Sequence, residues 1–449
     1  MLGERINIRN VFIGNFCYFC IAAVALLAVF FILHNANWVN GDDFEWVKTT
    51  ALGIAEPISY HVGNGRFVPF NHFDSNLTLF LPYGNTAFVH YLLVSMVFCL
   101  ASFFLLKALK KHVPGTNGVL LLVSYSFFVY ESVNVYLSII YPEKIIILGF
   151  ALFMYLFQKL HDENSFVFLI LLCIVVLYIT YAKEPVFGVF VVFSLINLIF
   201  RKRKIKVNEK RFCYFCLLNA LVYALLYYFI VFLHSDLFYN QGRVQLSYIQ
   251  NIVESFKHQP FLIIIGGFLF YRIYIVLKSR EISVLDAFLF MSVAYCSAYF
   301  ILKLNDGYYF IPSVVLALPS ICKALSELLQ QKKIKYLVYV FLCLLLYKSA
   351  KNIIVMGEAT SYNRTYYPEY FQNLARIAET NTIYAVTDSL KMSDLHYGYK
   401  VKNDEIFIGY WMTPRNLNYK FTYISSVDSV PKGGYVRIYD NDELKFYKK

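Results

Sequence analysis

Long apolar runs alternate with short polar connections over the first 355 residues of the chain. The runs occupy residues 11–33, 87–106, 119–135, 145–157, 166–181, 186–200, 212–233, 261–277, 284–302, 308–321 and 336–355. A helix needs roughly 20 apolar residues to cross a bilayer, and aromatic or polar flanks complete the shorter runs inside a bundle. The pattern therefore predicts an all-α polytopic membrane protein with about eleven transmembrane helices.

The pattern changes near residue 356, which divides the chain into a transmembrane domain (1–355) and a tail (356–449). The tail mixes charged residues with alternating apolar ones, which predicts a helix at 366–379 and strands at 382–386, 405–410, 435–439 and 444–447. We expect a small external α/β domain. It has no glycine-rich phosphate loop, Ser/His/Asp spacing or metal-ligand cluster, so a structural or acceptor-docking role is favoured over independent catalysis.

Composition agrees with a membrane location, since 59% of the residues are hydrophobic and 19% are aromatic. The net charge of +12 raises the question of a nucleic-acid partner. However, the basic clusters at 107–111, 201–206 and 332–335 all fall on one side of the predicted membrane, as the positive-inside pattern requires. The charge thus predicts a cytoplasmic N-terminus and an external tail, with membrane lipids and no nucleic acid as partners.

All nine cysteines lie in or beside apolar runs, which argues against an external disulfide framework. Two Cys-Tyr-Phe-Cys sequences, at 17–20 and 213–216, lie near predicted cytoplasmic helix ends and have the spacing of metal ligands. Their apolar surroundings favour buried small side chains instead. We expect no cofactor and no metal at these residues, and the sequence leaves a divalent metal elsewhere open.

The most informative polar stretch follows the first apolar run. Asp42 and Asp43 come directly after Gly41 and open a predicted amphipathic helix at 43–55. Either carboxylate can cap that helix, and because adjacent residues point about 100° apart, one can cap while the other faces a cavity. Farther along the same loop, before a second short helix at 72–81, Arg66 is either a solvated charge or a ligand for phosphate oxygens.

Other charged residues lie at the predicted outer ends of later spans. Glu131 and Glu184 are candidates for an acceptor or cavity site, as is Asp306. Lys183 either forms a charged hairpin with the adjacent Glu184 or contacts a lipid phosphate, and Lys303 brings a further cation to the same face.

Two motifs resemble the GT-C superfamily of membrane glycosyltransferases, which includes protein O-mannosyltransferases, the lipid A aminoarabinose transferase and serotype-converting glucosyltransferases. Gly41-Asp-Asp-Phe44 with Gly63-Asn-Gly-Arg66 is similar to the acidic motif and the downstream Gly-Arg of bacterial members. The stretch 307–319 is similar to a later span that often begins Arg-Tyr and contains two prolines, but Tyr308 stands where that arginine would fall. Arg66, Lys183 or Lys303 would then have to supply the missing cation.

The resemblance implies transfer of a sugar from a polyprenyl-phosphate donor to a hydroxyl of a glycan, lipid or protein acceptor, at the outer face of a bacterial cell membrane. It implies Asp42 as the base, Asp43 as a capping or orienting residue, and one or more of the three cations as the phosphate ligand. A single displacement would invert the anomeric centre. A transporter or flippase, or a polymerase, of lipid-linked saccharides is the alternative. A transporter would more typically contain related halves, which the sequence does not show.

Overall fold

The computed structural model describes residues 8–34, 65–71, 73–82, 87–112, 118–138, 141–235, 247–304, 306–331, 333–345 and 347, together with five strands between 383 and 448. Asp42, Asp43 and the helices predicted at 43–55 and 366–379 lie outside these residues. The short helix predicted at 72–81 is present as α3 (Phe73–Thr78).

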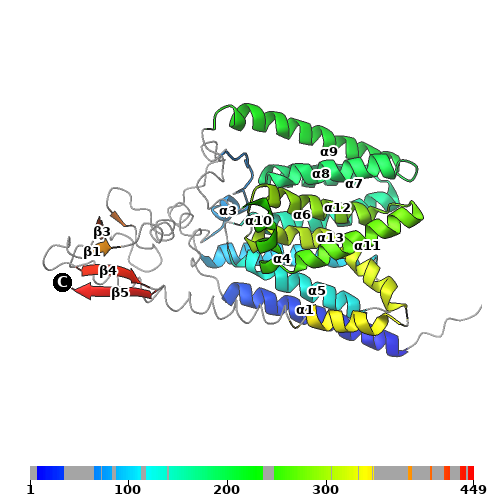
Figure 1. The fold of residues 1–449 in the computed structure, drawn as a ribbon, viewed down its shortest axis with the longest axis horizontal. Coiled ribbons are helices and arrows are strands. Elements are labelled where there is room, and N and C mark those ends of the chain that lie inside the picture. Colours follow the sequence, from blue (N-terminus) through cyan, green and yellow to red (C-terminus); the bar gives the residue numbers. More distant parts are fainter. Residues whose placement is uncertain are drawn as a thin grey trace, which may run out of the picture.

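The described helices form a bundle in which the long elements lie side by side (Figure 1). Their bounds are α1 (Ile8–His34), α4 (Ala87–Lys110), α5 (Gly118–Ser132), η2 (Val133–Leu137), α6 (Glu143–Glu163), α7 (Phe166–Ala182), α8 (Pro185–Phe200), α9 (Val207–Leu226), η3 (Tyr227–Phe232), α10 (Tyr248–His258), α11 (Phe261–Ser279), α12 (Val284–Ile301), α13 (Gly307–Leu329) and Lys335–Leu345.

Eight helices of the described residues are long and apolar enough to cross a membrane. Two shorter apolar helices, Phe166–Ala182 and Pro185–Phe200, coincide with further predicted runs, and a third, Lys335–Leu345, covers the described first part of the run at 336–355. The prediction of a polytopic, mainly α-helical membrane protein is therefore confirmed at this level.

Local sequence explains where several helices begin and end. The Ser165 and Ser247 side chains accept hydrogen bonds from backbone N–H groups at the starts of α7 and α10, and Pro185 occupies the first turn of α8. Asn164 ends α6 in the left-handed conformation with φ 49°, which asparagine tolerates better than most residues.

The centre of the bundle is aromatic and tightly packed. Phe153 of α6 lies 5.1 Å from Phe190 and 5.2 Å from Phe193 between ring centroids, in edge-to-face geometry. A Cβ atom at Gly149 would lie 2.3 Å from Ile179 Cγ2, so α6 and α7 approach closely at this glycine. Helix α13 is the most enclosed of the candidate spans, since 94% of its most apolar 18-residue stretch is buried. Neighbouring helices can therefore compensate the backbone groups freed by its two internal prolines.

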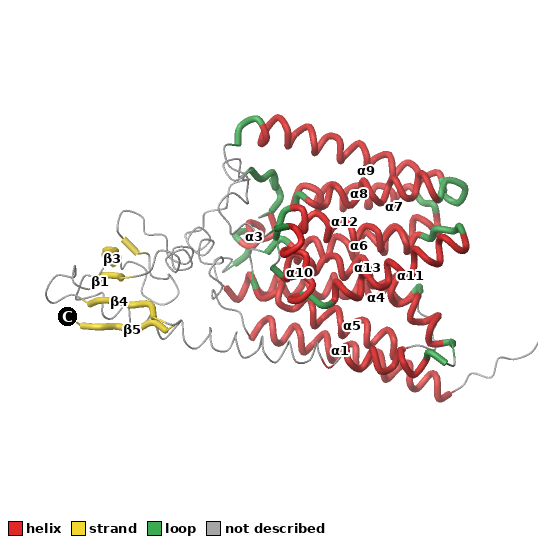
Figure 2. Tube along the Cα trace, viewed as in Figure 1, coloured by secondary structure: helices red, strands yellow, loops and turns green. Residues whose placement is uncertain are grey.

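The described strands form one five-stranded sheet in the order β2-β3-β1-β4-β5 (Figure 2). They are β1 (Ile383–Val386), β2 (Glu405–Ile406), β3 (Tyr419–Ile424), β4 (Tyr435–Asp440) and β5 (Glu443–Lys448). β1 pairs in parallel with β3 and β4, whereas β2–β3 and β4–β5 are antiparallel. The sequence pattern predicted four of these strands and missed β3. Because the predicted helix at 366–379 is not described, the α/β domain itself stays a prediction.

Candidate functional site

The segment 65–71, from the predicted first external loop, is attached to the helix bundle by backbone contacts. Gly65 has φ 69°, a left-handed conformation that favours glycine. Its carbonyl oxygen accepts a hydrogen bond of 3.0 Å from the Tyr227 hydroxyl, and the Phe67 carbonyl accepts one of 2.8 Å from Tyr223. Phe70 N–H donates to the Tyr181 carbonyl at 3.1 Å. These bonds fix the backbone on both sides of Arg66.

Aromatic packing reinforces this attachment. The Phe67 ring packs against Tyr181 and Tyr223, with centroids 6.1 and 5.5 Å away. Phe70 stacks on Tyr178 of α7 at 5.8 Å. Arg66 thus projects from a backbone held against α7 and α9, although it belongs to a loop.

The turn between α7 and α8 supplies the partner of Arg66. The Arg66 Nε and Nη2 atoms donate to the two carboxylate oxygens of Glu184 at 2.8 and 3.3 Å, a bidentate geometry. The hairpin pairing considered for Lys183 and Glu184 is wrong. Lys183 has extended φ and ψ angles of −155° and 128°, whereas Glu184 is already α-helical, and the two side chains have different partners.

Lys183 pairs instead with the first residue of α6. Its Nζ atom lies 2.8 Å from Oε1 of Glu143, and the side chains are only 6% and 0% exposed. The same Nζ lies 5.0 Å from the centroid of the Tyr309 ring. The next residue of α6, Lys144, pairs with Asp74 of α3 at 3.3 Å. Three ion pairs from distant segments therefore join the loop, α3, α6 and the α7–α8 turn.

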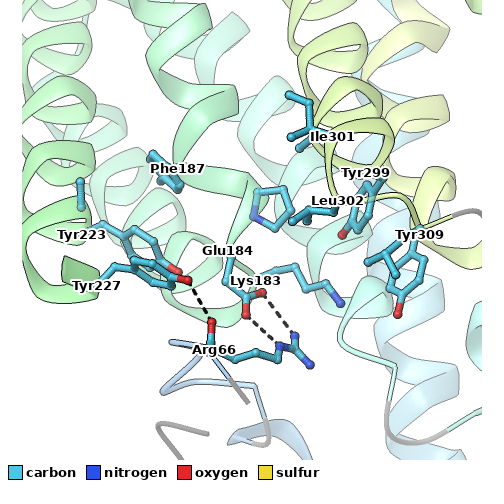
Figure 3. A pocket seen from close by; sticks show the side chains of 15 residues that line it. Arg66, Lys183, Glu184, Phe187, Tyr223, Tyr227, Tyr299, Ile301, Leu302 and Tyr309 are labelled. Atoms are coloured by element: carbon cyan, nitrogen blue, oxygen red, sulfur yellow. Dashed lines mark hydrogen bonds and ion pairs between the residues drawn. The ribbon is translucent and has the colours of Figure 1, made fainter. Parts of the chain in front are cut away.

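A cavity of about 450 Å³ opens beside two of these pairs. Figure 3 shows Tyr223 and Tyr227 on one side of it and Tyr299 and Tyr309 on the other, with the charged residues between them. It is lined by Gly65, Arg66, Lys183, Glu184, Pro185, Phe187, Tyr223, Ala224, Tyr227, Ala298, Tyr299, Ile301, Leu302, Leu304 and Tyr309. The walls are thus mainly apolar and aromatic, and two cations and one carboxylate face the space.

The charges are arranged to keep Glu184 ionised. Burial alone would raise the pKa of its carboxyl group, but the hydrogen-bonded Arg66 guanidinium and the nearby Lys183 ammonium together lower that pKa below its usual value of 4.5. Tyr227 lies in η3, a short π-helix that continues α9. Such irregular turns frequently accompany functional sites.

The structure brings together some of the predicted site residues and separates others. Arg66, Lys183 and Glu184 line the cavity. Lys303 does not line it, because its ammonium group lies over the Tyr248 ring, 4.6 Å from the centroid. The residues on either side of it, Leu302 and Leu304, are lining residues. Glu131, in α5, and Asp306, before α13, are not lining residues either. Lys303, Glu131 and Asp306 therefore do not line this cavity, and their roles in phosphate or acceptor binding stay predictions.

Tyr308, which stands where the resemblance expects an arginine, stacks on Tyr141 with centroids 4.1 Å apart. The adjacent Tyr309 lines the cavity and lies under Lys183. A lysine contributed by the α7–α8 turn therefore occupies this region.

Sequence reasoning missed Glu143, Tyr223 and Tyr227. Glu143 lies two residues before an apolar run, and a carboxylate in the first turn of a helix is also expected from the helix dipole, so its sequence position alone did not mark it. The two tyrosines lie inside a run that is apolar on all sides, where periodicity gives no sign of which face meets a cavity.

Among the described residues, no group of three or more His, Cys, Asp or Glu side chains is placed to hold a metal ion. The structure therefore does not assemble the two Cys-Tyr-Phe-Cys sequences into a metal site, and their cysteines are free. Comparison with protein-family models and with curated protein sequences found no significant match to the chain.

Proposed function

We propose that this protein is a GT-C type membrane glycosyltransferase that transfers a sugar from a polyprenyl-phosphate donor to an acceptor hydroxyl at the outer face of the cell membrane. The observation that carries the proposal is the presence of Arg66 and Lys183 in one apolar cavity. The donor has the same two features, an anionic phosphate and a long apolar chain.

The cavity suits such an amphiphile in size and chemistry. Its volume of about 450 Å³ lies within the range of roughly 300–1,000 Å³ typical of small-molecule sites. Ile301, Leu302 and Phe187 offer apolar surface to the first isoprene units. The guanidinium of Arg66 offers a fork of N–H donors that matches phosphate oxygens, and Lys183 adds a point charge.

Arg66 and Lys183 each form an ion pair with a carboxylate of the protein. Glu184 and Glu143 neutralise Arg66 and Lys183. Since each guanidinium or ammonium has further N–H donors, a phosphate can share the cation with its carboxylate. The carboxylates would hold the two cations in place before the donor arrives, so that less ordering is needed on binding.

In the proposed reaction, the bond between the anomeric carbon and the phosphate oxygen breaks, and the phosphate leaves with the electron pair. The acceptor oxygen attacks the anomeric carbon from the opposite face, which inverts its configuration, and its proton passes to a carboxylate base. Arg66 and Lys183 stabilise the negative charge on the leaving phosphate. The GT-C resemblance assigns the base to Asp42, with Asp43 capping or orienting; both lie outside the described residues.

The proposed orientation has a cytoplasmic N-terminus and places the cavity on the outer side. The basic cluster at 107–111 lies at the end of α4 and the one at 201–206 follows the end of α8, while the cavity lies at the α7–α8 turn. This arrangement supports the positive-inside assignment. The sheet in the tail would then form part of an external α/β domain that docks the acceptor.

The proposal is tested by replacing Asp42 with Asn in the full-length protein. Asn keeps the size and a capping oxygen, so folding and donor binding should be preserved. It cannot accept the proton, so turnover should fall on the order of a hundredfold or more. The matched Asp43→Asn variant should lose less activity.

Mass spectrometry of cell-surface glycans from cells with and without the protein supplies the readout, because loss of one sugar differs from loss of a whole polymer. Normal transfer by Asp42→Asn would contradict the assignment of the base. Near-normal transfer by the double Asn variant would contradict the transferase and favour a transporter of lipid-linked saccharides.

A further inference from the structure

A second cavity, of about 350 Å³, lies at the opposite end of α6 from the candidate site. It is lined by Lys107, Lys110, Lys111, Tyr155, Gln158, Lys159 and Asp162, from the last turns of α4 and α6 and the residue after α4. At 1.5 Å per residue, the stretch of α6 from Glu143, beside the candidate site, to the lining residues Tyr155–Asp162 separates the two cavities by roughly 18–28 Å. This second cavity has no part in the proposed transfer chemistry.

Its positive charge is only partly neutralised. Lys111 pairs with Asp162 at 2.6 Å, and Lys159 pairs with Glu163 at 2.9 Å. In contrast, Lys107 and Lys110 lie over aromatic rings of Phe103 and Tyr18, at 5.3 and 5.2 Å. Within the described part of the chain, neither of these two ammonium groups has a carboxylate oxygen within 4.0 Å.

The two lysines continue an exposed apolar stripe on α4. Leu92, Met96, Leu100 and Phe103 are all exposed large hydrophobic residues. Steps of three or four residues place them, and then Lys107 and Lys110, on one face of the helix. The candidate spans Phe88–Lys110 and Glu143–Glu163 both end at this cavity, which sets the lysines at the boundary between hydrocarbon and water.

We propose that this basic cavity binds the phosphate group of an anionic phospholipid, whose acyl chains lie along the stripe on α4. The stripe matches the acyl chains and the two cations match the headgroup. Residues at i and i+3 lie about 5–6 Å apart on a helix, so both ammonium groups can reach one phosphate. Basic cavities between transmembrane helices commonly bind such headgroups. The lipid would brace α4 against α6 at the end opposite the candidate site.

The test uses native mass spectrometry of the purified full-length protein, titrated with phosphatidylglycerol, phosphatidylcholine or inorganic phosphate. Wild-type protein should bind phosphatidylglycerol more tightly than phosphatidylcholine. The double variant Lys107→Gln, Lys110→Gln should lose affinity for phosphatidylglycerol by roughly 25-fold, about fivefold for each cation removed. Both side chains are exposed, so the fold should be retained.

The control variant is Lys333→Gln, Lys335→Gln, which removes the same charge from exposed positions outside the cavity. Lys335 also lies over a ring, that of Tyr339 at 5.7 Å, so the control matches the cation–π contact as well. It should keep wild-type affinity, as should the charge-preserving Lys107→Arg, Lys110→Arg variant.

Three results would overturn the proposal. Equal losses in the cavity variant and the control would show diffuse charge attraction, and equal binding of both lipids would show that no headgroup is recognised. If inorganic phosphate bound as tightly as phosphatidylglycerol and displaced it, the cavity would be a site for a free anion. If the Gln variant fails to fold, failure of the Arg variant to bind would serve as the refuting measurement.

Discussion

The ion pair between Arg66 and Glu184 makes a quantitative prediction about how the first loop is held on the bundle. The perturbation is a double-mutant cycle of Arg66→Gln, Glu184→Gln and the two changes together. Removing either partner leaves the other charged side chain in a mainly apolar cavity, whereas the double variant leaves two neutral amides that can still hydrogen bond. The losses of unfolding free energy in the two single variants should therefore add up to more than the loss in the double variant.

The size of the effect follows from geometry and exposure. Two unit charges about 4 Å apart attract by about 4 kcal/mol at an effective dielectric constant of about 20. The side chains are 20% and 22% exposed, so the pair lies between exposed pairs, worth about 0.2–1 kcal/mol, and fully buried ones, where losing one partner costs about 3–5 kcal/mol. We expect a coupling free energy of about 1–3 kcal/mol.

The assay is unfolding in mixed detergent micelles, followed by far-ultraviolet circular dichroism as a function of pH. The pKa of Glu184 is lowered in the folded protein, so its ionised form stabilises the fold. That stabilisation is complete well above the usual pKa of 4.5 and is lost as the pH falls below 4.5 through the folded pKa. The Glu184→Gln variant should lack this part of the acid sensitivity.

A coupling energy below about 0.3 kcal/mol, which is within the error of additivity, would refute the reasoning. An acid profile of Glu184→Gln identical to wild type would refute the assignment of the pH effect. Arg66→Lys provides the matched control, because it keeps the charge but loses the bidentate fork, and it should retain only part of the coupling.

Three further outcomes are expected. Gly65→Ala should destabilise the folded protein by about 1–2 kcal/mol, because φ 69° is strained for alanine, and a loss below about 0.3 kcal/mol in the same unfolding assay would contradict this. Under the proposed function, Lys183→Gln should raise the KM for the donor on the order of tenfold, while Lys303→Gln should change this KM little, because Lys303 is outside the cavity lining. A larger effect of Lys303→Gln in steady-state kinetics would show that the phosphate binds near Lys303 and not in this cavity. In intact cells whose native cysteines have been replaced, a membrane-impermeant thiol reagent should label the Ser389→Cys variant and not the Lys202→Cys variant, whose site is exposed. Labelling of Lys202→Cys alone would show that the orientation in the membrane is the opposite one.

The sequence by itself determined the membrane class and the positions of the helices. The apolar runs recur as helices at the predicted places, because the length and hydrophobicity of a span depend only on consecutive residues. It also supplied a glycine at position 65, where the chain takes the left-handed conformation that glycine adopts at no steric cost.

Only the tertiary structure decided which charges meet. Lys183 and Glu184 are adjacent in the chain, yet their backbone conformations differ and their partners, Glu143 and Arg66, come from distant segments. The cavity has a similar origin, because Tyr227 and Tyr309 belong to apolar runs whose inward faces become defined only when helices pack. Hydrophobicity fixes the location of a span through local sequence, whereas its rotation and neighbours depend on contacts between segments far apart in the chain.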